Sequence, residues 1–191
     1  MKRVFIIHGW SGSPEADWLP WLKKEWESRG IWTAVPFMPN PDEPVIDHWI
    51  NHLAKVVGVP DRETYFVGHS IGCQAILRYV EHGGSHIGGA VFVAGWFHLT
   101  NMETDEEKRI AKPWLETPID FEKVRALIPQ SVAIFSDNDP DVPLAINRSI
   151  FESQLGSQII VESAKGHFTG SDSVTLLPSA LDAIRGLMNE R

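Results

Sequence analysis

Residues 65–72 carry a short apolar run directly into a serine flanked by glycines: Tyr65-Phe66-Val67-Gly68-His69-Ser70-Ile71-Gly72. The run has the length and apolar character of a buried strand, and the residues that follow, 71–82, form a helical pattern. A chain that reverses so abruptly from strand to helix holds the serine in a strained backbone conformation. Glycines on both sides let the strand and the helix approach closely around the bend. The pattern therefore predicts a strand–serine–helix turn whose hydroxyl projects above the edge of a sheet.

Short apolar runs alternate with longer helical patterns along the rest of the chain, and this alternation is typical of a parallel sheet with crossover helices. The runs are rich in Val, Ile and Phe without strict alternation, as strands buried on both faces should be. We therefore predict an α/β fold with a mostly or wholly parallel sheet of about six strands and helices on both faces. The expected strands are 4–7, 32–35, 65–67, 90–94, 132–135 and 158–161, and the expected helices are 15–29, one that begins near Pro44, 71–82, 121–127, 143–155 and 175–188.

Length and composition indicate one globular domain over residues 1–191. The chain has the ordinary length of one domain, and its 43% hydrophobic and 22% charged residues are typical of a globular protein. No internal repeat, low-complexity tract or linker divides it. The longest irregular stretch, 96–130, is predicted to be a crossover with a long lead-in, a small lid over a site, or both.

Charge and cysteine content argue against several classes of partner. A formal net charge of -8 disfavours nucleic-acid and anionic membrane partners, since both require a basic face. No apolar run reaches the length of a membrane span, and the run at 4–7 is shorter than that of an export signal. The single cysteine, Cys73, permits no intramolecular disulfide. We therefore expect a cytoplasmic protein with neither a membrane nor a nucleic-acid partner.

A base and an acid are expected close to Ser70. A serine hydroxyl is a weak nucleophile that needs a base within hydrogen-bond reach, and in this kind of turn the partners follow in the order Ser, Asp or Glu, His. The sequence has that order: carboxylates follow the strand at 132–135, and His167 lies in a glycine-bearing loop after the last predicted strand. Because the carboxyl ends of parallel strands meet at one edge of a sheet, these side chains should lie near Ser70.

Three carboxylates compete for the position that orients His167, namely Asp137, Asp139 and Asp141. We predict Asp139, because its place three residues before Val142 turns the side chain back toward the histidine loop. Asp137, which lies nearest the strand end, is the alternative. Asp141 fits better as an exposed residue or as a cap for the helix that begins near 143.

Two backbone amides are expected to stabilise a negatively charged oxygen. Ile71 lies at the N-terminus of the predicted helix, and Trp10 lies in a glycine-bearing loop after the first strand. That loop has no phosphate-binding glycine pattern, so nucleotide binding is not expected. His48 and His52 stand four residues apart, but no acidic or cysteine ligand accompanies them, and no metal is predicted. The candidate walls of a substrate pocket are Trp96, Phe97, Leu99 and Phe168, in addition to Trp10.

Several segments together resemble the small serine hydrolases of the YdeN and retinoblastoma-binding-protein-nine type. The likeness rests on GHSIGCQAILRYVE around the serine, the opening VFIIHGWSGSP, the segment PFMPNP, the loop SDNDPDVP and the closing KGHF, and it covers nearly the whole chain. The resemblance implies a compact α/β-hydrolase fold with a minimal cap and a triad of Ser70, Asp139 and His167. It also favours Asp139 over Asp137.

The residues and the resemblance lead to one main hypothesis. The chain is expected to hydrolyse small carboxylic esters or related acyl compounds through an acyl-enzyme, with a small-molecule acyl substrate as partner and without a metal or organic cofactor. A thioesterase or lyase on the same scaffold is one alternative. A catalytically weak or inactive protein that serves as a protein-interaction module is the other.

Overall fold

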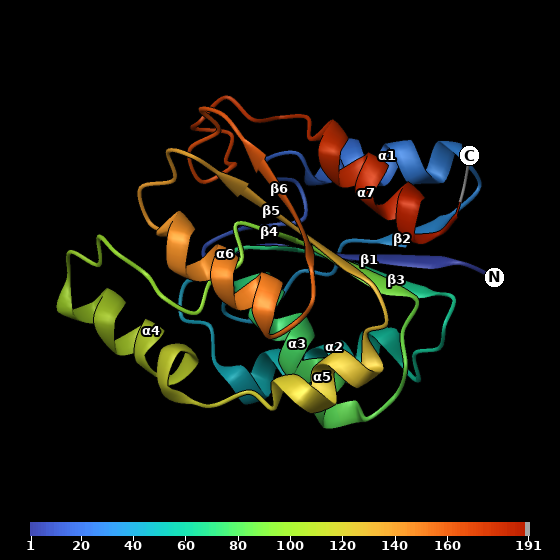
Figure 1. Ribbon diagram of the computed structural model, residues 1–191, viewed down its shortest axis with the longest axis horizontal. Helices are drawn as coiled ribbons and strands as arrows, with labels where there is room; N and C mark the ends of the chain where they lie inside the picture. The colour runs from blue at the N-terminus through green and yellow to red at the C-terminus, as the bar shows by residue number, and fades with distance from the viewer. Residues whose placement is uncertain (190–191) are drawn as a thin grey trace.

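The computed structural model describes residues 1–189 and contains a six-stranded sheet with the order β2-β1-β3-β4-β5-β6 (Figure 1). All five pairs of neighbouring strands are parallel. Each strand lies within two residues of its predicted range, so the prediction of a parallel sheet of about six strands is confirmed. The strands are β1 Arg3–Ile7, β2 Trp32–Ala34, β3 Thr64–His69, β4 Gly89–Val93, β5 Ser131–Ser136 and β6 Gln158–Glu162.

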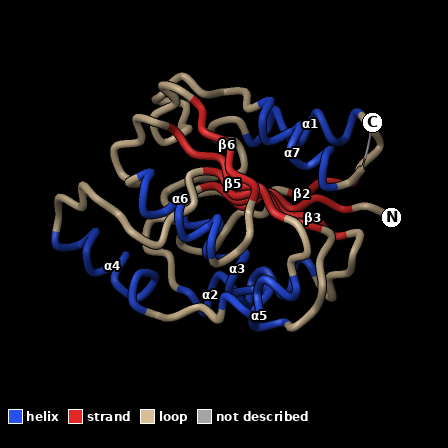
Figure 2. Tube along the Cα trace, in the orientation of Figure 1, coloured by secondary structure: helices blue, strands red, loops and turns tan. Residues whose placement is uncertain are grey.

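Helices cover both faces of the sheet (Figure 2). One layer contains α1 and α7, and the other contains α2, α3, α5 and α6, with α4 at its margin. Successive strand residues alternate between the layers: Val4 and Ile6 pack toward α1 and α7, whereas Phe5 and Ile7 pack toward the other layer. This two-sided burial explains why the strands read as continuous apolar runs. The helices are α1 Leu19–Ser28, α2 Ile46–Val57, α3 Ile71–Gly83, α4 Asp105–Glu116, α5 Phe121–Leu127, α6 Leu144–Ser153 and α7 Pro178–Leu187.

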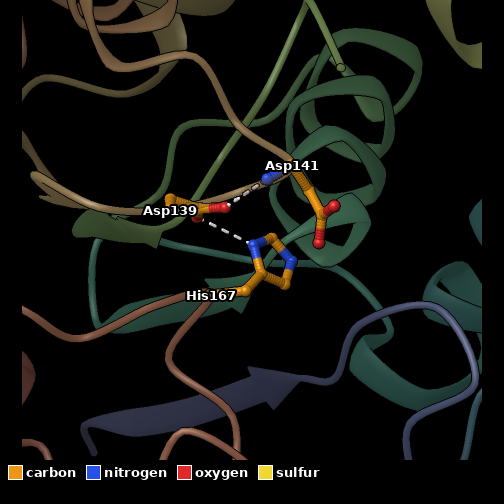
Figure 3. A group of neighbouring side chains, drawn as sticks. All are labelled: Asp139, Asp141 and His167. Carbon is orange, nitrogen blue, oxygen red and sulfur yellow. Dashed lines mark hydrogen bonds and ion pairs between the residues drawn. The ribbon is translucent and has the colours of Figure 1, made fainter. Parts of the chain in front are cut away.

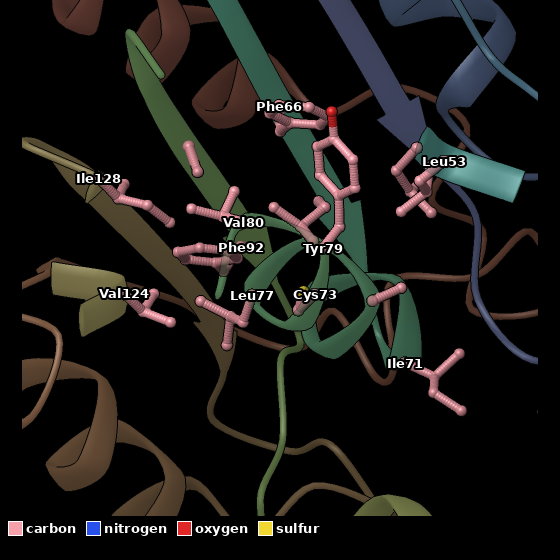
Figure 4. Packing of buried hydrophobic residues seen from close by; sticks show 14 of the residues in the cluster. Leu53, Phe66, Ile71, Cys73, Leu77, Tyr79, Val80, Phe92, Val124 and Ile128 are labelled. Atoms are coloured by element: carbon pink, nitrogen blue, oxygen red, sulfur yellow. The ribbon is translucent and has the colours of Figure 1, made fainter. Parts of the chain in front are cut away.

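The helix that follows the serine turn, α3, is packed into the core along most of its length. All of its residues from Ile71 to Val80 are buried. Leu77 lies in the same cluster as Phe92 of β4 (Figure 4). Burial raises the pKa of the Cys73 thiol, so this residue belongs to the core and is not a reactive thiol. The packing of α3 therefore fixes the position of the turn before it.

Four helices begin later than predicted: α6 by one residue, α7 by three, and α1 and α2 for the reasons that follow. The helix expected at 15–29 begins at Leu19, because Asp17 adopts a positive φ of 57°, which a right-handed helix does not contain. Pro44 does not open α2, since Val45 after it is still extended, with φ -113° and ψ 128°. These corrections leave the buried faces unchanged.

The stretch 96–130 contains a helix that the sequence analysis did not predict. This helix, α4, begins with a capping box in which Thr104 and Glu107 bond reciprocally, whereas the expected helix at 121–127 is present as α5. α5 packs beside α3 in the core, and only the part of the stretch up to Ile110 contributes to the cavity described below. Among residues 1–189, no helix is long and apolar enough to cross a membrane.

Candidate active site

Ser70 occupies the bend between β3 and α3. Its φ of 53° and ψ of -124° are strained for a residue other than glycine, and such strain clusters at functional sites. The flanking glycines provide the room that the bend requires: a Cβ on Gly68 would lie 2.8 Å from a backbone nitrogen of α3, and one on Gly72 would lie 2.5 Å from the carbonyl oxygen of Ile7. The amide of Ser70 donates to the carbonyl of Val93 on β4 at 2.9 Å, so the bend is tied to the sheet.

The side chains of Ser70, His167 and Asp139 form a continuous hydrogen-bonded chain. Ser70 Oγ lies 2.9 Å from His167 Nε2, and His167 Nδ1 lies 2.8 Å from Asp139 Oδ2. The three residues follow β3, β6 and β5, whose carboxyl ends meet at one edge of the sheet. The carboxylate fixes the proton of the neutral imidazole on Nδ1, which leaves Nε2 free to accept the serine proton. The arrangement suits a nucleophile, a base and an orienting acid.

The carboxylates after β5 point in different directions. Asp139 faces His167, and its Oδ1 accepts a hydrogen bond from the amide of Asp141 at 2.9 Å (Figure 3). Asp137 turns away from the histidine and accepts a hydrogen bond from the hydroxyl of Ser163 at 2.6 Å. Asp141 does not cap the following helix and is only partly exposed, which corrects that expectation; its carboxylate lies beside the imidazole of His167 (Figure 3). Geometry therefore assigns the contact with His167 to Asp139.

The surroundings of His167 favour its charged form. Burial lowers the pKa of His167, but the hydrogen bond and the charge of Asp139, with the charges of Asp141 and Asp172, outweigh it and raise the pKa above its ordinary value of 6.5. Asp172 also accepts a hydrogen bond from the amide of His167 at 2.9 Å, which fixes the loop after β6. Burial raises the pKa of Asp141.

Of the two residues whose amides are expected to hold a negative oxygen, Ile71 directly follows Ser70, and Trp10 lines the same cavity as Ser70. Ile71 is the first residue of α3, and the first N–H groups of a helix have no partner within it. Trp10 follows β1, the neighbour of β3, and its amide has no acceptor within residues 1–189. The indole Nε1 of Trp10 donates to the carbonyl of Asp42 at 2.9 Å and holds the loop in place.

His69, the variable residue of the serine motif, lies against His167. Its Nε2 lies 2.8 Å from the carbonyl oxygen of His167, and the two ring centroids are 5.2 Å apart. Burial lowers the pKa of His69 to about 4, so its ring is neutral at pH 7. Its buried Nδ1 has no hydrogen-bond partner within the described part of the chain and lies 3.8 Å from Asp17 Oδ2. The sequence motif specifies only the glycines and the serine, and gave no indication of these contacts.

A cavity of about 750 Å³ opens over Ser70 and His167, a volume within the range of small-molecule sites. Trp10, Trp96 and Leu99 lie in its wall. The indole Nε1 of Trp96 donates to Ser70 Oγ at 3.2 Å, and both side chains are buried. This contact with the serine goes beyond the wall position that the sequence indicated for Trp96.

Two of the expected wall residues are absent from the cavity, which corrects the prediction. The ring of Phe97 packs against Phe121 and Phe151 instead, with centroids 5.1 and 5.2 Å apart. Phe168 adopts a positive φ of 58°, and its side chain is fully buried in the layer that contains α1 and α7. Both aromatic rings thus pack in or against the hydrophobic core and do not line the cavity.

One group of side chains has donor atoms spaced closely enough for a metal ion. Oxygens of Asp139 and Asp141 and a nitrogen of His167 all lie within 4.8 Å of one another (Figure 3). However, Asp139 and His167 are hydrogen-bonded to each other, and His167 Nε2 faces Ser70. The remaining carboxylate would be a single uncommitted ligand, so the donor set fits proton transfer better than metal binding.

The chain belongs to the serine hydrolase family, whose model matches residues 4–185. The YdeN hydrolase of Bacillus subtilis (strain 168) is 30% identical over 186 residues, which cover 96% of this chain and 94% of that protein. The serine hydrolase RBBP9 of Rattus norvegicus is 25% identical over 173 residues, which cover 89% of each chain. The protein is therefore a hydrolase related to these two.

The solved structures lead to the same fold. The crystal structure of the ydeN gene product of B. subtilis superposes with a TM-score of 0.89 and 28% identity over 100% of both chains. Est1E of Butyrivibrio proteoclasticus superposes with a TM-score of 0.74 over 99% of this chain and 89% of that one, and at 15% identity this likeness concerns the fold alone. The predicted α/β-hydrolase fold is confirmed.

Proposed function

We propose that this hydrolase cleaves small carboxylic esters, with Ser70 as nucleophile, His167 as general base and Asp139 as the orienting acid. The observation that carries the proposal is the unbroken chain of contacts from Ser70 Oγ through His167 to Asp139, at 2.9 and 2.8 Å. Ser70 and His167 line a cavity of about 750 Å³, large enough for a small acyl substrate. The reaction needs no cofactor.

The geometry supports acyl transfer to water in two steps. As Ser70 Oγ attacks the carbonyl carbon, its proton passes to His167 Nε2, and the amides of Trp10 and Ile71 hold the oxyanion. The protonated imidazole then gives its proton to the departing alcohol, which leaves the acyl group on Ser70. Water attacks this ester with His167 again as base, and the carboxylic acid departs. Asp139 keeps the imidazole oriented and stabilises its charged form.

Burst kinetics with p-nitrophenyl acetate test the proposal. The account expects rapid release of about one p-nitrophenolate per protein molecule, followed by a slower steady rate, because an acyl-enzyme accumulates when water attack is the slower step. If the folded protein releases p-nitrophenolate no faster than buffer does, esterase activity on short acyl groups is ruled out. The protein-interaction role would then be the better account.

Substitution of Trp96 by phenylalanine should lower kcat/KM for p-nitrophenyl acetate by about tenfold. The indole N–H is a donor to Ser70 Oγ at 3.2 Å, and it directs the serine proton toward His167. Phenylalanine keeps a ring in the buried position but removes this donor. Rates should be divided by the concentration of sites titrated with a fluorophosphonate, so that partial unfolding does not imitate a catalytic loss. An unchanged rate per titrated site would show that the contact has no catalytic consequence.

Hydrolysis should fall at acid pH with a limiting pKa above 6.5. Protonation of His167 Nε2 removes the acceptor for the serine proton, and the surrounding carboxylates hold the pKa of His167 above that ordinary value. Asp141→Asn removes one of these charges, so its acid limb should move to lower pH. Profiles of kcat/KM for a neutral ester in both proteins measure the shift. A limb that stays in place in the variant, or no acid limb at all, would contradict this assignment.

A further inference from the structure

The cavity over Ser70 has a strongly one-sided charge. Within the described residues, its wall contains no lysine or arginine. Its two histidines, His69 and His167, differ in the charge of their rings. His69 is neutral at pH 7, whereas the charge of His167 is balanced by Asp139. The acidic side chains of the wall are Asp17, Asp42, Glu43, Glu106, Glu107 and Asp141.

Two of these carboxylates share an arginine, and a third is part of the capping box of α4. Glu43 and Glu106 share Arg109, which is exposed and is not part of the wall, at 2.6 and 3.4 Å. Glu107 accepts hydrogen bonds from the amide and the hydroxyl of Thr104 at the start of α4. The remaining three, Asp17, Asp42 and Asp141, have no lysine or arginine partner within residues 1–189, so the cavity keeps an uncompensated negative charge.

In the corner formed by Asp17 and His69, one acceptor atom of each side chain has no hydrogen-bond donor among residues 1–189. His69 Nε2 faces the carbonyl oxygen of His167, so this nitrogen bears the ring proton and Nδ1 is an acceptor. That Nδ1 is buried without a partner, and it lies 3.8 Å from Asp17 Oδ2, a second acceptor. The other oxygen of Asp17 accepts a hydrogen bond from the amide of Gly170 at 2.7 Å, which holds the carboxylate in this orientation. Nδ1 is closed to solvent, whereas the Asp17 side chain is 17% exposed, so Asp17 is the acceptor of this corner that a bound group with N–H donors can reach.

We infer that the cavity selects esters that carry an ammonium group and discriminates against esters that carry a carboxylate. Asp17 is the anchor for the ammonium group, and Asp42 and Asp141 add to the attraction. An ammonium group supplies the positive charge that this wall lacks, and it supplies N–H donors for the carboxylate of Asp17. The inference rests on the proposed function, because it names the substrate class of the same site.

Three aryl acetates of similar size and different charge test the inference. They are 4-(aminomethyl)phenyl acetate, 4-(hydroxymethyl)phenyl acetate and 4-(carboxymethyl)phenyl acetate, and the released phenol is measured at pH 7. We expect kcat/KM to fall by about tenfold from the cationic to the neutral ester and again to the anionic ester. The difference should shrink at high salt, since the cavity is open to solvent.

Substitutions identify the origin of the preference. Asp17→Asn keeps an oxygen acceptor for Gly170 but removes the charge, and should lower the ratio of cationic to neutral kcat/KM by about tenfold. Asp42→Asn is the second variant, because Asp42 lies on an exposed loop where substitution does not disturb the core. Glu122→Gln on α5 removes one charge from an exposed position outside the cavity and should leave the ratio unchanged. The ratio is independent of the fraction of folded enzyme.

The outcomes distinguish failure of the charge preference from failure of the esterase proposal. Equal kcat/KM for all three esters, with hydrolysis that depends on Ser70, would overturn the charge preference and leave the esterase proposal intact. A preference that survives in Asp17→Asn would overturn Asp17 as the anchor, whatever the effect of Asp42→Asn. Failure to hydrolyse any of the three esters would remove the esterase proposal and this inference with it.

Discussion

Replacement of Ser70 by alanine is expected to lower kcat for p-nitrophenyl acetate by about 10⁵- to 10⁶-fold. The substitution removes the hydroxyl oxygen that both His167 Nε2 and the indole of Trp96 contact. The fold should persist, because the Ser70 side chain makes no capping bond to α3 and the backbone strain at φ 53° is the same for both residues. Stopped-flow and steady-state assays on protein with a native circular dichroism spectrum measure the loss.

A matched control separates this effect from the removal of any hydroxyl. Ser153 is exposed near the end of α6, and its hydroxyl donates only to the carbonyl of Ser149. Ser153→Ala should retain the wild-type rate. If Ser70→Ala retained more than about a hundredth of the wild-type kcat, a residue other than Ser70 would have to be the nucleophile.

Asp139→Asn should lower kcat by about 10⁴-fold, by analogy with the measured effect in other serine hydrolases. The asparagine amide can occupy the same space, but it permits the imidazole to carry its proton on Nε2, where it cannot accept one from Ser70. It also removes the charge that stabilises the imidazolium during acyl transfer. Steady-state kcat with p-nitrophenyl acetate is again the measurement, and the acid limb of the pH profile should move to lower pH.

Asp137→Asn is the comparison that tests the choice between the two carboxylates. Asp137 binds the hydroxyl of Ser163 and the amide of Ala164, and it does not touch His167. Its neutral variant should therefore keep kcat within about tenfold of the wild type. A larger loss in Asp137→Asn than in Asp139→Asn would show that the acid has been assigned wrongly.

The sheet could be predicted from the sequence because its strands are buried on both faces. Phe5 and Val4 belong to different core layers, so both must be apolar, and the run at 4–7 stands out without any alternation. The placement of Ser70, Asp139 and His167 followed from the same principle. All strands are parallel, so the loops that carry these three residues leave the sheet at one edge.

The sequence analysis missed helix α4 and the burial of Phe168. Both depend on tertiary packing, which the local sequence pattern does not encode. α4 has a polar surface and contains Pro113, and the available signal was the capping-box pair Thr104 and Glu107. Phe168 was assigned to the cavity because it follows His167, but its positive φ and full burial result from how the loop crosses to the α1 and α7 layer. An aromatic residue next to a site is equally compatible with either environment.

The negative charge of the cavity likewise could not be predicted from the sequence. Acidic residues are spread along the chain, and those of the cavity wall come from separate loops and from α4. Asp17 and Asp141 are 124 positions apart in the chain, yet both face the same cavity. Only the fold shows that they line one cavity.

Covalent labelling with a fluorophosphonate tests the central claim, that Ser70 is the activated nucleophile, most directly. The serine oxygen should displace fluoride from phosphorus, and mass spectrometry of the digested protein should find one adduct, on the peptide that contains Ser70. Labelling should be absent in Ser70→Ala and should slow at acid pH as His167 becomes protonated. No adduct on the folded wild-type protein, or an adduct on a different residue, would contradict the account.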